Sequence, residues 1–530
     1  MDLASFAGPF LPELLLVAAA LLVFLLDVLH VRRNEVVGLV AVVGTLAALF
    51  VVLADLGFAP IAGFATIPAG QIDAVPTGEP LYTFTSFGLV FQGIFLAATL
   101  LVALASLSRP SHERGAPIFY GLLLLATLGM LLVAIASDLI FLLLAIEIVS
   151  IATYLLVAYT RRDPRSLEAA MKFYIIGALS TVLSFFGASL LYGAYGTTNL
   201  VAIAGVHGTN GAPVLVLLGY GFLIAGLAFK ATLVPFHAWA VDVYDGAPND
   251  VSAFLAGGSK KVGIFAIFLV LLGPILLVRT AQAGLPFATG TVALGPVLQI
   301  TIAVLAVVTM TVGNVLALLQ KEMKRMLAYS SISQAGYMMI GIAVGTAPAL
   351  AGATLQVFAH VFMKGGAFLV VAGLTSLGVG PLIEDYRGVG VKRPVLGISF
   401  GLMLLSLAGV PLTIGFVSKF VLFSAAVQAQ GYFVWLAVAG LLNSALSVFY
   451  YARVLKVMFF DAPLPRPTPA DGGAVVGGSE PERLGVGGLG WGRAAAIALS
   501  VAVIVGVGIY PQIVLGPIQS AAQHFVALGM

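Results

Sequence analysis

The sequence lacks cysteine entirely and has very little charge. None of its 530 residues is Cys, and only 9% are Asp, Glu, Lys or Arg, whereas about 25% of the residues of a soluble protein are charged. Without cysteine the chain has no disulfides, no thiolate metal site and no Cys-ligated iron–sulfur cluster. With so little charge it cannot cover a water-facing surface. The net charge of +3 is spread over scattered cations, so we expect no nucleic-acid partner.

Apolar residues take the place of the missing charge. They make up 61% of the chain, and the mean hydropathy is +1.11. A helix that crosses a bilayer needs about 20 apolar residues. Runs of this kind predict an all-α polytopic membrane protein with about 14 transmembrane helices. The predicted spans are residues 10–29, 36–56, 82–107, 117–136, 139–159, 169–193, 213–233, 249–278, 294–318, 327–346, 349–376, 396–423, 432–460 and 493–517.

The positive charges of the connecting loops alternate in the way that this span count requires. Even-numbered loops carry one cation, Arg279. Odd-numbered loops carry sixteen: Arg32, Arg33, Arg109, Arg114, Arg161, Arg162, Arg165, Lys321, Lys324, Arg325, Arg387, Lys392, Arg393, Arg466, Arg483 and Arg493. Because cytoplasmic loops are enriched in Lys and Arg, we expect the odd loops in the cytoplasm and both termini on the outer side.

The spans divide the chain into five parts. Residues 1–115 hold the first three helices, residues 116–278 a block of five (helices 4–8) and residues 294–460 a second block of five (helices 9–13). Because five is odd, the second block enters the membrane inverted relative to the first. Residues 461–492 are rich in Gly and Pro and predict a flexible cytoplasmic linker. Residues 493–530 hold the last helix.

A small group of charged residues falls inside the apolar runs. Each central charge costs roughly 2.5–3.5 kcal/mol on insertion scales, so such residues indicate function. All the cations of the group are lysines, and a buried lysine can release its proton whereas arginine holds it. A row of such lysines is what a proton relay requires. The group consists of Lys172, Lys230, Lys260, Lys261, Lys364 and Lys419, with Glu147 as the matching acid.

Two of the predicted helices are interrupted next to these lysines. Pro235 follows Lys230 by five residues, and Pro411 precedes Lys419. Proline removes a backbone donor, which lipid tolerates only where the backbone lines a cavity or is buried in protein. Each break falls in the fourth helix of its block, and matching breaks in two halves indicate a transporter core.

Polar residues on single helix faces accompany the lysines. Glu147, Ser150 and Tyr154 share one face, and Gln356, His360 and Lys364 share another. The stretch Tyr329–Gln334 opens a further helix with hydroxyls and an amide that can hold water.

Simpler interpretations stay open for some members of the group. Lys172 lies near a span end and could extend to the cytoplasmic face. Lys260 and Lys261 are adjacent, so we expect only one of them to face the interior. Glu13 and Asp27 lie near span ends, and we expect them at the membrane interface.

Four stretches together carry a family signature. They are GLAFKATLVPFHAWAVDVYDGAP (226–248), FLAGGSKKVGIFAIF (254–268), KRMLAYSSISQAGYMMIGI (324–342) and LSLAGVPLTIGFVSKF (405–420). With these motifs the chain resembles the antiporter-like membrane subunits of respiratory complex I, in the branch of chain N of NADH-quinone oxidoreductase. The likeness extends from about the second span to the fourteenth.

The resemblance implies roles for individual residues. Glu147 would be the acid of the fifth helix and Lys230 the lysine of the broken seventh, and the two would form a switching pair. Lys260 would be the linking lysine of the eighth helix and Lys419 the terminal lysine of the broken twelfth. Further candidate relay residues are Lys172, Lys261, His360 and Lys364.

The implied function is that of a proton-translocating membrane subunit of a NADH:quinone oxidoreductase-type complex, in the plasma membrane of a prokaryote. Quinone and NADH, or another reduced donor, would be used by the complex, while this chain would bind no metal or cofactor and hold no redox centre. Its partners would be the lipid bilayer and other membrane subunits, including sister antiporter-like subunits. The alternatives are a subunit of a multi-subunit cation/proton antiporter, a small-solute transporter and a scaffold without transport.

Overall fold

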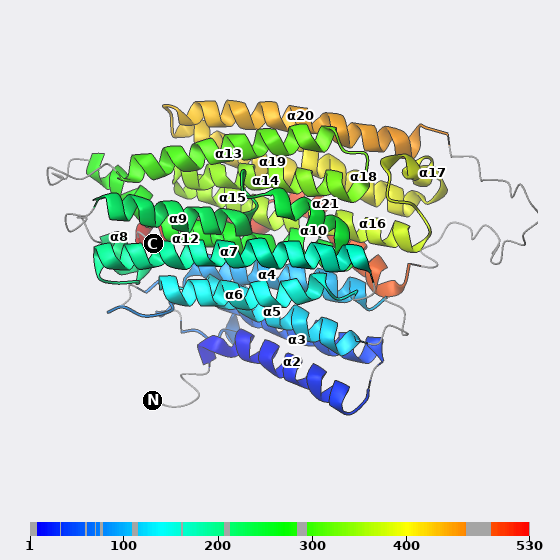
Figure 1. Ribbon diagram of the computed structural model, residues 1–530, viewed down its shortest axis with the longest axis horizontal. Helices are drawn as coiled ribbons and strands as arrows, with labels where there is room; N and C mark the ends of the chain where they lie inside the picture. Colours follow the sequence, from blue (N-terminus) through cyan, green and yellow to red (C-terminus); the bar gives the residue numbers. More distant parts are fainter. Residues whose placement is uncertain are drawn as a thin grey trace, which may run out of the picture.

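The computed structural model describes residues 8–31, 33–58, 61–68, 70–74, 78–108, 115–160, 163–205, 213–282, 294–462 and 489–528. Most of the predicted linker and seven loop cations lie outside these residues, namely Arg32, Arg109, Arg114, Arg161, Arg162, Arg466 and Arg483. The described residues form a bundle of helices that run side by side, with isolated β-bridges but no strands (Figure 1).

The first part of the chain forms three N-terminal helices and the first block. The N-terminal helices are α2 (Leu11–Val28), α3 (Asn34–Asp55) and α4 (Ser86–Ser106). The first block comprises α5 (Ala116–Ala134), α6 (Leu139–Val157), α7 (Pro164–Tyr195), the short α8 (Leu200–Gly205), α9 (Pro213–Ala231), α10 (Ala238–Gly246), α11 (Asn249–Phe254), η3 (Leu255–Ser259) and α12 (Lys260–Gln282).

The second block and the C-terminal helices follow. The block comprises α13 (Leu294–Leu318), α14 (Met323–Val344), α15 (Ala347–His360), η4 (Val361–Gly365), α16 (Gly366–Ser376), η5 (Ile383–Tyr386), α17 (Val389–Lys392), α18 (Pro394–Ala408), α19 (Ile414–Gln428) and α20 (Phe433–Phe459). The chain ends in α21 (Trp491–Ile509) and α22 (Gln512–Leu528).

The predicted fold class is confirmed. In the described part of the chain, 12 helices are long and apolar enough to cross a membrane. A further predicted span is the 22-residue α14, which contains three serines and one glutamine, and another is the pair of short apolar helices α18 and α19. All fourteen predicted spans therefore coincide with helical residues. The division into five domains stays a prediction.

Both predicted helix breaks are present. α9 ends at Ala231 and α10 begins at Ala238, with Pro235 between them. α18 ends at Ala408 and α19 begins at Ile414, with Pro411 between them. The fourth helix of each block is thus split into two halves in the middle of the bundle.

Two other long helices contain a widened turn that was not predicted. The π-helical turns η3 and η4 interrupt the helices α11–α12 and α15–α16. η3 contains the pair Gly257–Gly258, and η4 ends at the first residue of the pair Gly365–Gly366. A Cβ on Gly257 would lie 3.6 Å from the carbonyl oxygen of Val361, so the two turns pack against each other. π-helical turns occur frequently at functional sites.

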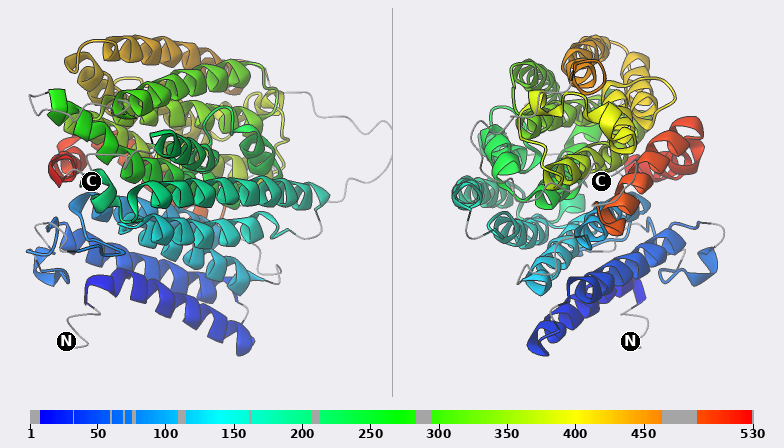
Figure 2. Two further views of the ribbon diagram at one scale, coloured as in Figure 1. Left: turned by 60° about the vertical axis from the view of Figure 1, so that its left-hand side comes forward. Right: turned by 90° about the vertical axis from the view of Figure 1, so that its right-hand side faces the viewer.

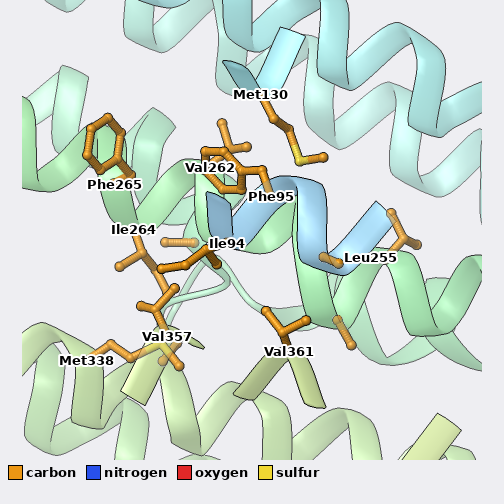
Figure 3. Close-up of a cluster of buried hydrophobic side chains, with 14 of the residues drawn as sticks. Ile94, Phe95, Met130, Leu255, Val262, Ile264, Phe265, Met338, Val357 and Val361 are labelled. Atoms are coloured by element: carbon orange, nitrogen blue, oxygen red, sulfur yellow. The ribbon is translucent and has the colours of Figure 1, made fainter. Parts of the chain in front are cut away.

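An apolar core encloses these widened turns. Figure 3 shows Leu255 and Val361, from the two turns, among side chains of several other helices. The labelled neighbours are Ile94, Phe95, Met130, Val262, Ile264, Phe265, Met338 and Val357, all buried. Viewed from the end of the bundle, α2 and α3 lie on one flank and α20 on the opposite flank (Figure 2). The interrupted helices of both blocks lie between these flanks.

Basic residues gather at one end of the bundle. α2 ends there, and α7, α14 and α18 begin there (Figure 1). The described cations Arg33, Arg165, Lys324 and Arg393 lie at these helix ends. This arrangement agrees with the predicted alternation of the loops, while the assignment of that end to the cytoplasm stays a prediction.

Three details differ from the sequence-based predictions. The chain turns at Tyr510, so the last predicted span is shorter and a separate amphipathic helix, α22, follows it. Arg493 lies inside α21 rather than in a loop, and is buried next to Asp250 at 3.6 Å. Glu13 is buried among the helices, which was not predicted, and Gln92 of α4 donates a hydrogen bond of 2.7 Å to its carboxylate; its place at the membrane interface stays a prediction.

Candidate functional site

In the first block, Glu147 and Lys230 lie near each other without direct contact. The ammonium of Lys230, in the last turn of α9, donates to Ser150 Oγ at 3.0 Å. The partly buried carboxylate of Glu147 accepts a hydrogen bond of 2.5 Å from Thr181 of α7. Among the described residues no ion pair joins the two charges. Each charge of the predicted pair is therefore held by a different hydroxyl, Lys230 by Ser150 and Glu147 by Thr181.

A small cavity lies between these two charges. Its volume is about 20 Å³, and Glu147, Ser150, Tyr154 and Lys230 all line it. Room for one water requires roughly 10–15 Å³, so the cavity suits about one water molecule. The predicted common face of Glu147, Ser150 and Tyr154 therefore borders a space that suits a bridging water.

Lys260 and Lys261 are both buried, because other helices enclose α12, and the expectation that only one of them faces the interior axis stays a prediction. Lys260 donates to the backbone carbonyl of Ser331 at 2.6 Å. Lys261 approaches His360 Nδ1 at 2.8 Å and donates to the carbonyl of Ala256 at 3.0 Å. The two side chains therefore leave α12 in different directions, Lys260 toward Ser331 of α14 and Lys261 toward His360 and the carbonyl of Ala256 inside η3.

The polar start of α14 connects two of the lysines. The backbone carbonyl of Ser331 accepts a hydrogen bond from Lys260. The side-chain hydroxyl of the adjacent Ser330 accepts one of 2.6 Å from the ammonium of Lys364. Ser330 also forms a short hydrogen bond with the hydroxyl of Tyr451 of α20. Two neighbouring residues of one helix thus link the first block to the second.

One turn further along α14, an amide network continues toward the last lysine. Gln356 donates to the side-chain oxygen of Gln334 at 2.6 Å, and Ser418 donates a short hydrogen bond to Gln356. Gln334 donates to the carbonyl of Leu407 at 3.4 Å, and the same carbonyl accepts the ammonium of Lys419 at 2.8 Å. Ser330 and Gln334 lie one turn apart on α14, so a polar thread made of two hydrogen-bonded groups extends from Ser330 to Lys419.

The second helix break supplies the partners of Lys419. α18 ends at Ala408, and the carbonyls of the last turn of a helix have no backbone N–H donor within that helix. Lys419 donates to the carbonyls of Leu407 and Ala408, at 2.8 and 3.0 Å, and to Ser444 Oγ at 2.9 Å. An ammonium at a helix C-terminus is also favoured by the helix dipole. A cavity of about 600 Å³ lies beside Lys419 between α19 and α20.

The helices that carry Lys230 and Lys260, α9 and α12, pack closely against each other. A Cβ on Gly263 of α12 would lie 2.6 Å from the carbonyl carbon of Lys230. Lys260 precedes Gly263 by three residues and so lies on the same face of α12. Glycine at 263 therefore lets the face that carries Lys260 approach the end of α9.

The buried lysines share one chemical feature. Each is at most 4% exposed, and each is held by hydroxyl, carbonyl or imidazole groups. Among the ion pairs of the described residues, none involves them. The residues are Lys230, Lys260, Lys261, Lys364 and Lys419.

Lys172 does not belong to this row. Its side chain is 42% exposed and forms ion pairs with Glu168 at 2.8 Å and Asp242 at 3.0 Å. Asp242 also pairs with Arg325 at 3.1 Å. These charges lie toward the basic end of the bundle and connect α7, α10 and α14.

Sequence reasoning missed several partners of the lysines. Thr181, Tyr451 and Ser444 were not singled out, because they lie on helices whose positions in the bundle were unknown. Lys324 of α14 was counted only as a loop cation, but it donates to the carbonyls of Asp245 and Ala247 at 2.5 and 2.9 Å. No simple sequence signal identifies these contacts.

Comparison with known proteins gives a consistent result. Residues 136–447 match the family model described as NADH:quinone oxidoreductase/Mrp antiporter, TM. F(420)H(2) dehydrogenase subunit N of Methanosarcina mazei is 41% identical over 85% of this chain and 89% of its own length. NADH-quinone oxidoreductase subunit N of Trichlorobacter lovleyi is 38% identical over 85% of this chain and 87% of its own length.

A solved structure is similar over nearly the whole chain. A chain of respiratory complex I from Thermus thermophilus, with bound aureothin, superposes with a TM-score of 0.71 at 30% identity. The match covers 95% of this chain and 98% of that chain. The region matched by the family model, residues 136–447, includes both helix breaks and all five buried lysines.

Proposed function

Because the chain belongs to the NADH:quinone oxidoreductase/Mrp antiporter membrane-subunit family, we propose that it is a subunit N-type component that carries protons across the membrane. Its similarity to two proteins named subunit N favours a place in an electron-transfer complex. The quinone and the reduced donor would be used by partner chains, with NADH or the F(420)H(2) of the Methanosarcina relative as candidate donors. Its direct partners would be sister membrane subunits.

One observation carries this proposal: the five buried lysines have neutral partners. A structural buried cation is normally matched by a carboxylate, since an unpaired charge in the interior is costly. A lysine held by hydroxyls and carbonyls keeps hydrogen-bond partners when it loses its proton, because the neutral amine is still a donor. Such lysines can therefore alternate between charged and neutral forms without rearrangement of the helices.

Glu147 and Lys230 would act as the switch. When a water or a small side-chain movement joins them, the carboxylate stabilises the ammonium and the proton stays. When they separate, the desolvated ammonium loses its counter-charge and gives up the proton. Loss of a partner from a buried pair costs about 3–5 kcal/mol, which exceeds the about 2.3 kcal/mol needed to move one charge across 100 mV.

The proton released by Lys230 would continue along the polar thread. Lys260 is its next acceptor, and Ser331 and Ser330 of α14 link Lys260 to Lys364. Gln334 and the carbonyl of Leu407 lead on to Lys419. Lys419 would release the proton through the adjacent cavity to the outer side, with both termini on that side. His360 and Lys261 would form a side branch of this route.

Reconstitution of the intact complex tests the proposal. Vesicles that contain the complex and a pH-sensitive dye should acidify internally when the electron donor and a quinone are supplied. Co-purified peripheral subunits would identify the donor. If electron transfer proceeds at full rate in the Lys230→Ala complex and proton transport is also unchanged, the proposed route is wrong.

The same family description includes Mrp antiporters, so a cation/proton antiporter is the second candidate. Vesicles that contain this chain and its membrane partners, but no donor, distinguish the two functions. Proton movement that requires added Na⁺ or K⁺ favours the antiporter, and movement that requires electron transfer favours the respiratory complex.

A further inference from the structure

A basic pocket lies at the end of the bundle where the other cations gather. It is formed where α16 leads through η5 and α17 into α18, and its volume is about 320 Å³. Three of its lining residues are Arg387, Lys392 and Arg393. Small-ligand pockets have volumes of about 300–1,000 Å³, so the space suits a small polar group.

The three cations have no protein counter-charge in the part of the chain that the structure describes. No ion pair or side-chain hydrogen bond there involves Arg387, Lys392 or Arg393. Nε of Arg387 is buried and has no acceptor among the described residues. A buried donor without an acceptor is costly, and guanidinium groups prefer phosphate or carboxylate oxygens.

One carboxylate, that of Asp385, also lines the pocket. Its single negative charge cannot balance three cations, and its Oδ2 accepts a hydrogen bond of 2.8 Å from the backbone nitrogen of Leu382. A Cβ on Gly380 would lie 2.3 Å from the same oxygen, so the carboxylate is held against the backbone. The pocket retains a net positive charge.

An apolar strip descends from the pocket along the outer surface. Val391, Val395 and Ile398 are each more than half exposed. Val395 and Ile398 lie three residues apart on one face of α18, and Val391 lies on α17, across the non-helical Arg393. All three are close in the sequence to the pocket cations Lys392 and Arg393. The site therefore combines unpaired cations at the helix ends with an apolar surface directed toward the membrane.

We propose that this pocket binds the phosphate of an anionic glycerophospholipid, with Arg387, Lys392 and Arg393 around the headgroup and the acyl chains along Val391, Val395 and Ile398. Basic pockets between transmembrane helices are suited to anionic headgroups. A free phosphate would use the cations but leave the apolar strip unexplained. The adjacent strip therefore favours a lipid over a soluble anion.

The test measures lipid binding to the full-length chain in detergent. The probes are dioleoyl phosphatidylglycerol and dioleoyl phosphatidylcholine, which have the same acyl chains, and inorganic phosphate alone. The test variant carries Arg387→Gln, Lys392→Gln and Arg393→Gln. The control variant is Lys456→Gln, which removes an exposed cation of α20 that does not line the pocket. Native mass spectrometry counts bound lipids, and the Tm of each variant reports whether it is folded.

We expect phosphatidylglycerol to bind more tightly than phosphatidylcholine and to raise the Tm of the unaltered chain. The triple variant should lose at least about tenfold in affinity for phosphatidylglycerol, since each cation near an anionic headgroup contributes. The control should bind as the unaltered chain does. A Val391→Ser, Ile398→Ser variant should weaken lipid binding without affecting weak binding of inorganic phosphate.

Three results would overturn the proposal. The first is equal affinity for the two lipids. The second is binding of inorganic phosphate with no binding of phosphatidylglycerol, which would assign the pocket to a soluble anion. The third is lipid binding that appears only after residues 463–488 are deleted, which would assign the pocket to the acidic residues of the linker.

Discussion

The two broken helices hold their lysines in different ways. Lys230, at the end of α9, has one hydroxyl partner, a carboxylate nearby and a cavity of about 20 Å³. Lys419, beside the end of α18, has two carbonyl partners and a hydroxyl, and its neighbouring cavity is about 600 Å³. The carboxylate of Glu147 lines the first cavity, and the second has no acidic residue among its lining residues.

This difference indicates that Lys230 and Lys419, which occupy matching positions in the two blocks, have different roles. A weakly held lysine next to a carboxylate responds to a small movement of that carboxylate. A lysine fixed by three neutral acceptors is held firmly, and the space beside it is open and lined mostly by apolar side chains. We infer that the first break determines when a proton moves and the second determines where it leaves.

The largest expected effect comes from removal of the switch lysine. Lys230→Met keeps the length and apolar character of the side chain, so the helices should still pack. Proton transport in vesicles should fall by about 10²-fold or more, as for loss of a proton-transfer group. Donor-driven pH change in reconstituted vesicles measures it, and the chain must still co-purify with its partners. Transport above half the normal rate would contradict the proposed switch.

The next effect tests whether Lys419 must lose its proton or only carry charge. Lys419→Arg preserves a cation, but arginine does not release its proton in proteins. We expect at least about a tenfold loss of transport with assembly retained. Normal transport by this variant would mean that Lys419 acts by its charge alone, and the role of the second break would need revision.

A paired comparison of two serines sharpens the contrast between the breaks. Ser150 is the single hydrogen-bond partner of Lys230 in the described structure, whereas Ser444 is one of three partners of Lys419. A hydrogen bond to a charged group contributes about 1.5–3 kcal/mol, so Ser150→Ala should reduce transport about tenfold or more. Ser444→Ala should reduce it only a few-fold. Equal effects would remove the distinction between a loosely and a firmly held lysine.

Lys172 should give the smallest effect. Its side chain is 42% exposed and its partners are Glu168 and Asp242, which makes it a surface ion-pair residue rather than a relay. Such pairs contribute about 0–1 kcal/mol, so Lys172→Gln should change the free energy of unfolding by no more than that. Proton transport should be nearly normal. A loss comparable with that of Lys230→Met would return Lys172 to the proton route.

The buried lysines of the candidate site could be identified from the sequence, but their hydrogen-bond partners could not. Buried lysines stand out because charge is rare in apolar runs, and the prolines near Lys230 and Lys419 indicated the breaks. The partners could not be predicted, because they lie far away in the sequence: Lys260 and Ser331 are 71 residues apart. Hydropathy alone also could not show that Lys172 is exposed, although Glu168, four residues earlier, offered a partner at helical spacing.

The widened turns escaped prediction for a different reason. The chain contains 61 glycines, so a Gly-Gly pair is a weak signal. Only the packing of η3 against η4 distinguishes these two Gly-Gly pairs from the other glycines of the chain. Lys260 contacts α14 and Lys261 contacts His360, in different directions from α12, and the sequence could not show which of the two has which neighbour.

The two widened turns also restrict how the length of the chain can vary. A π-helical turn contains one residue more than an α-helical turn would, so it is equivalent to an insertion that has become part of the helix. Deletion of one residue from Leu255–Ser259 would restore regular winding and rotate the helix after it by about 100° relative to the helix before it. Lys260 and Lys261 would then face the wrong neighbours, although composition and hydropathy would be almost unchanged. Insertions and deletions should therefore be tolerated in the connections between helices, and one missing residue at either turn should be as damaging as the loss of a lysine.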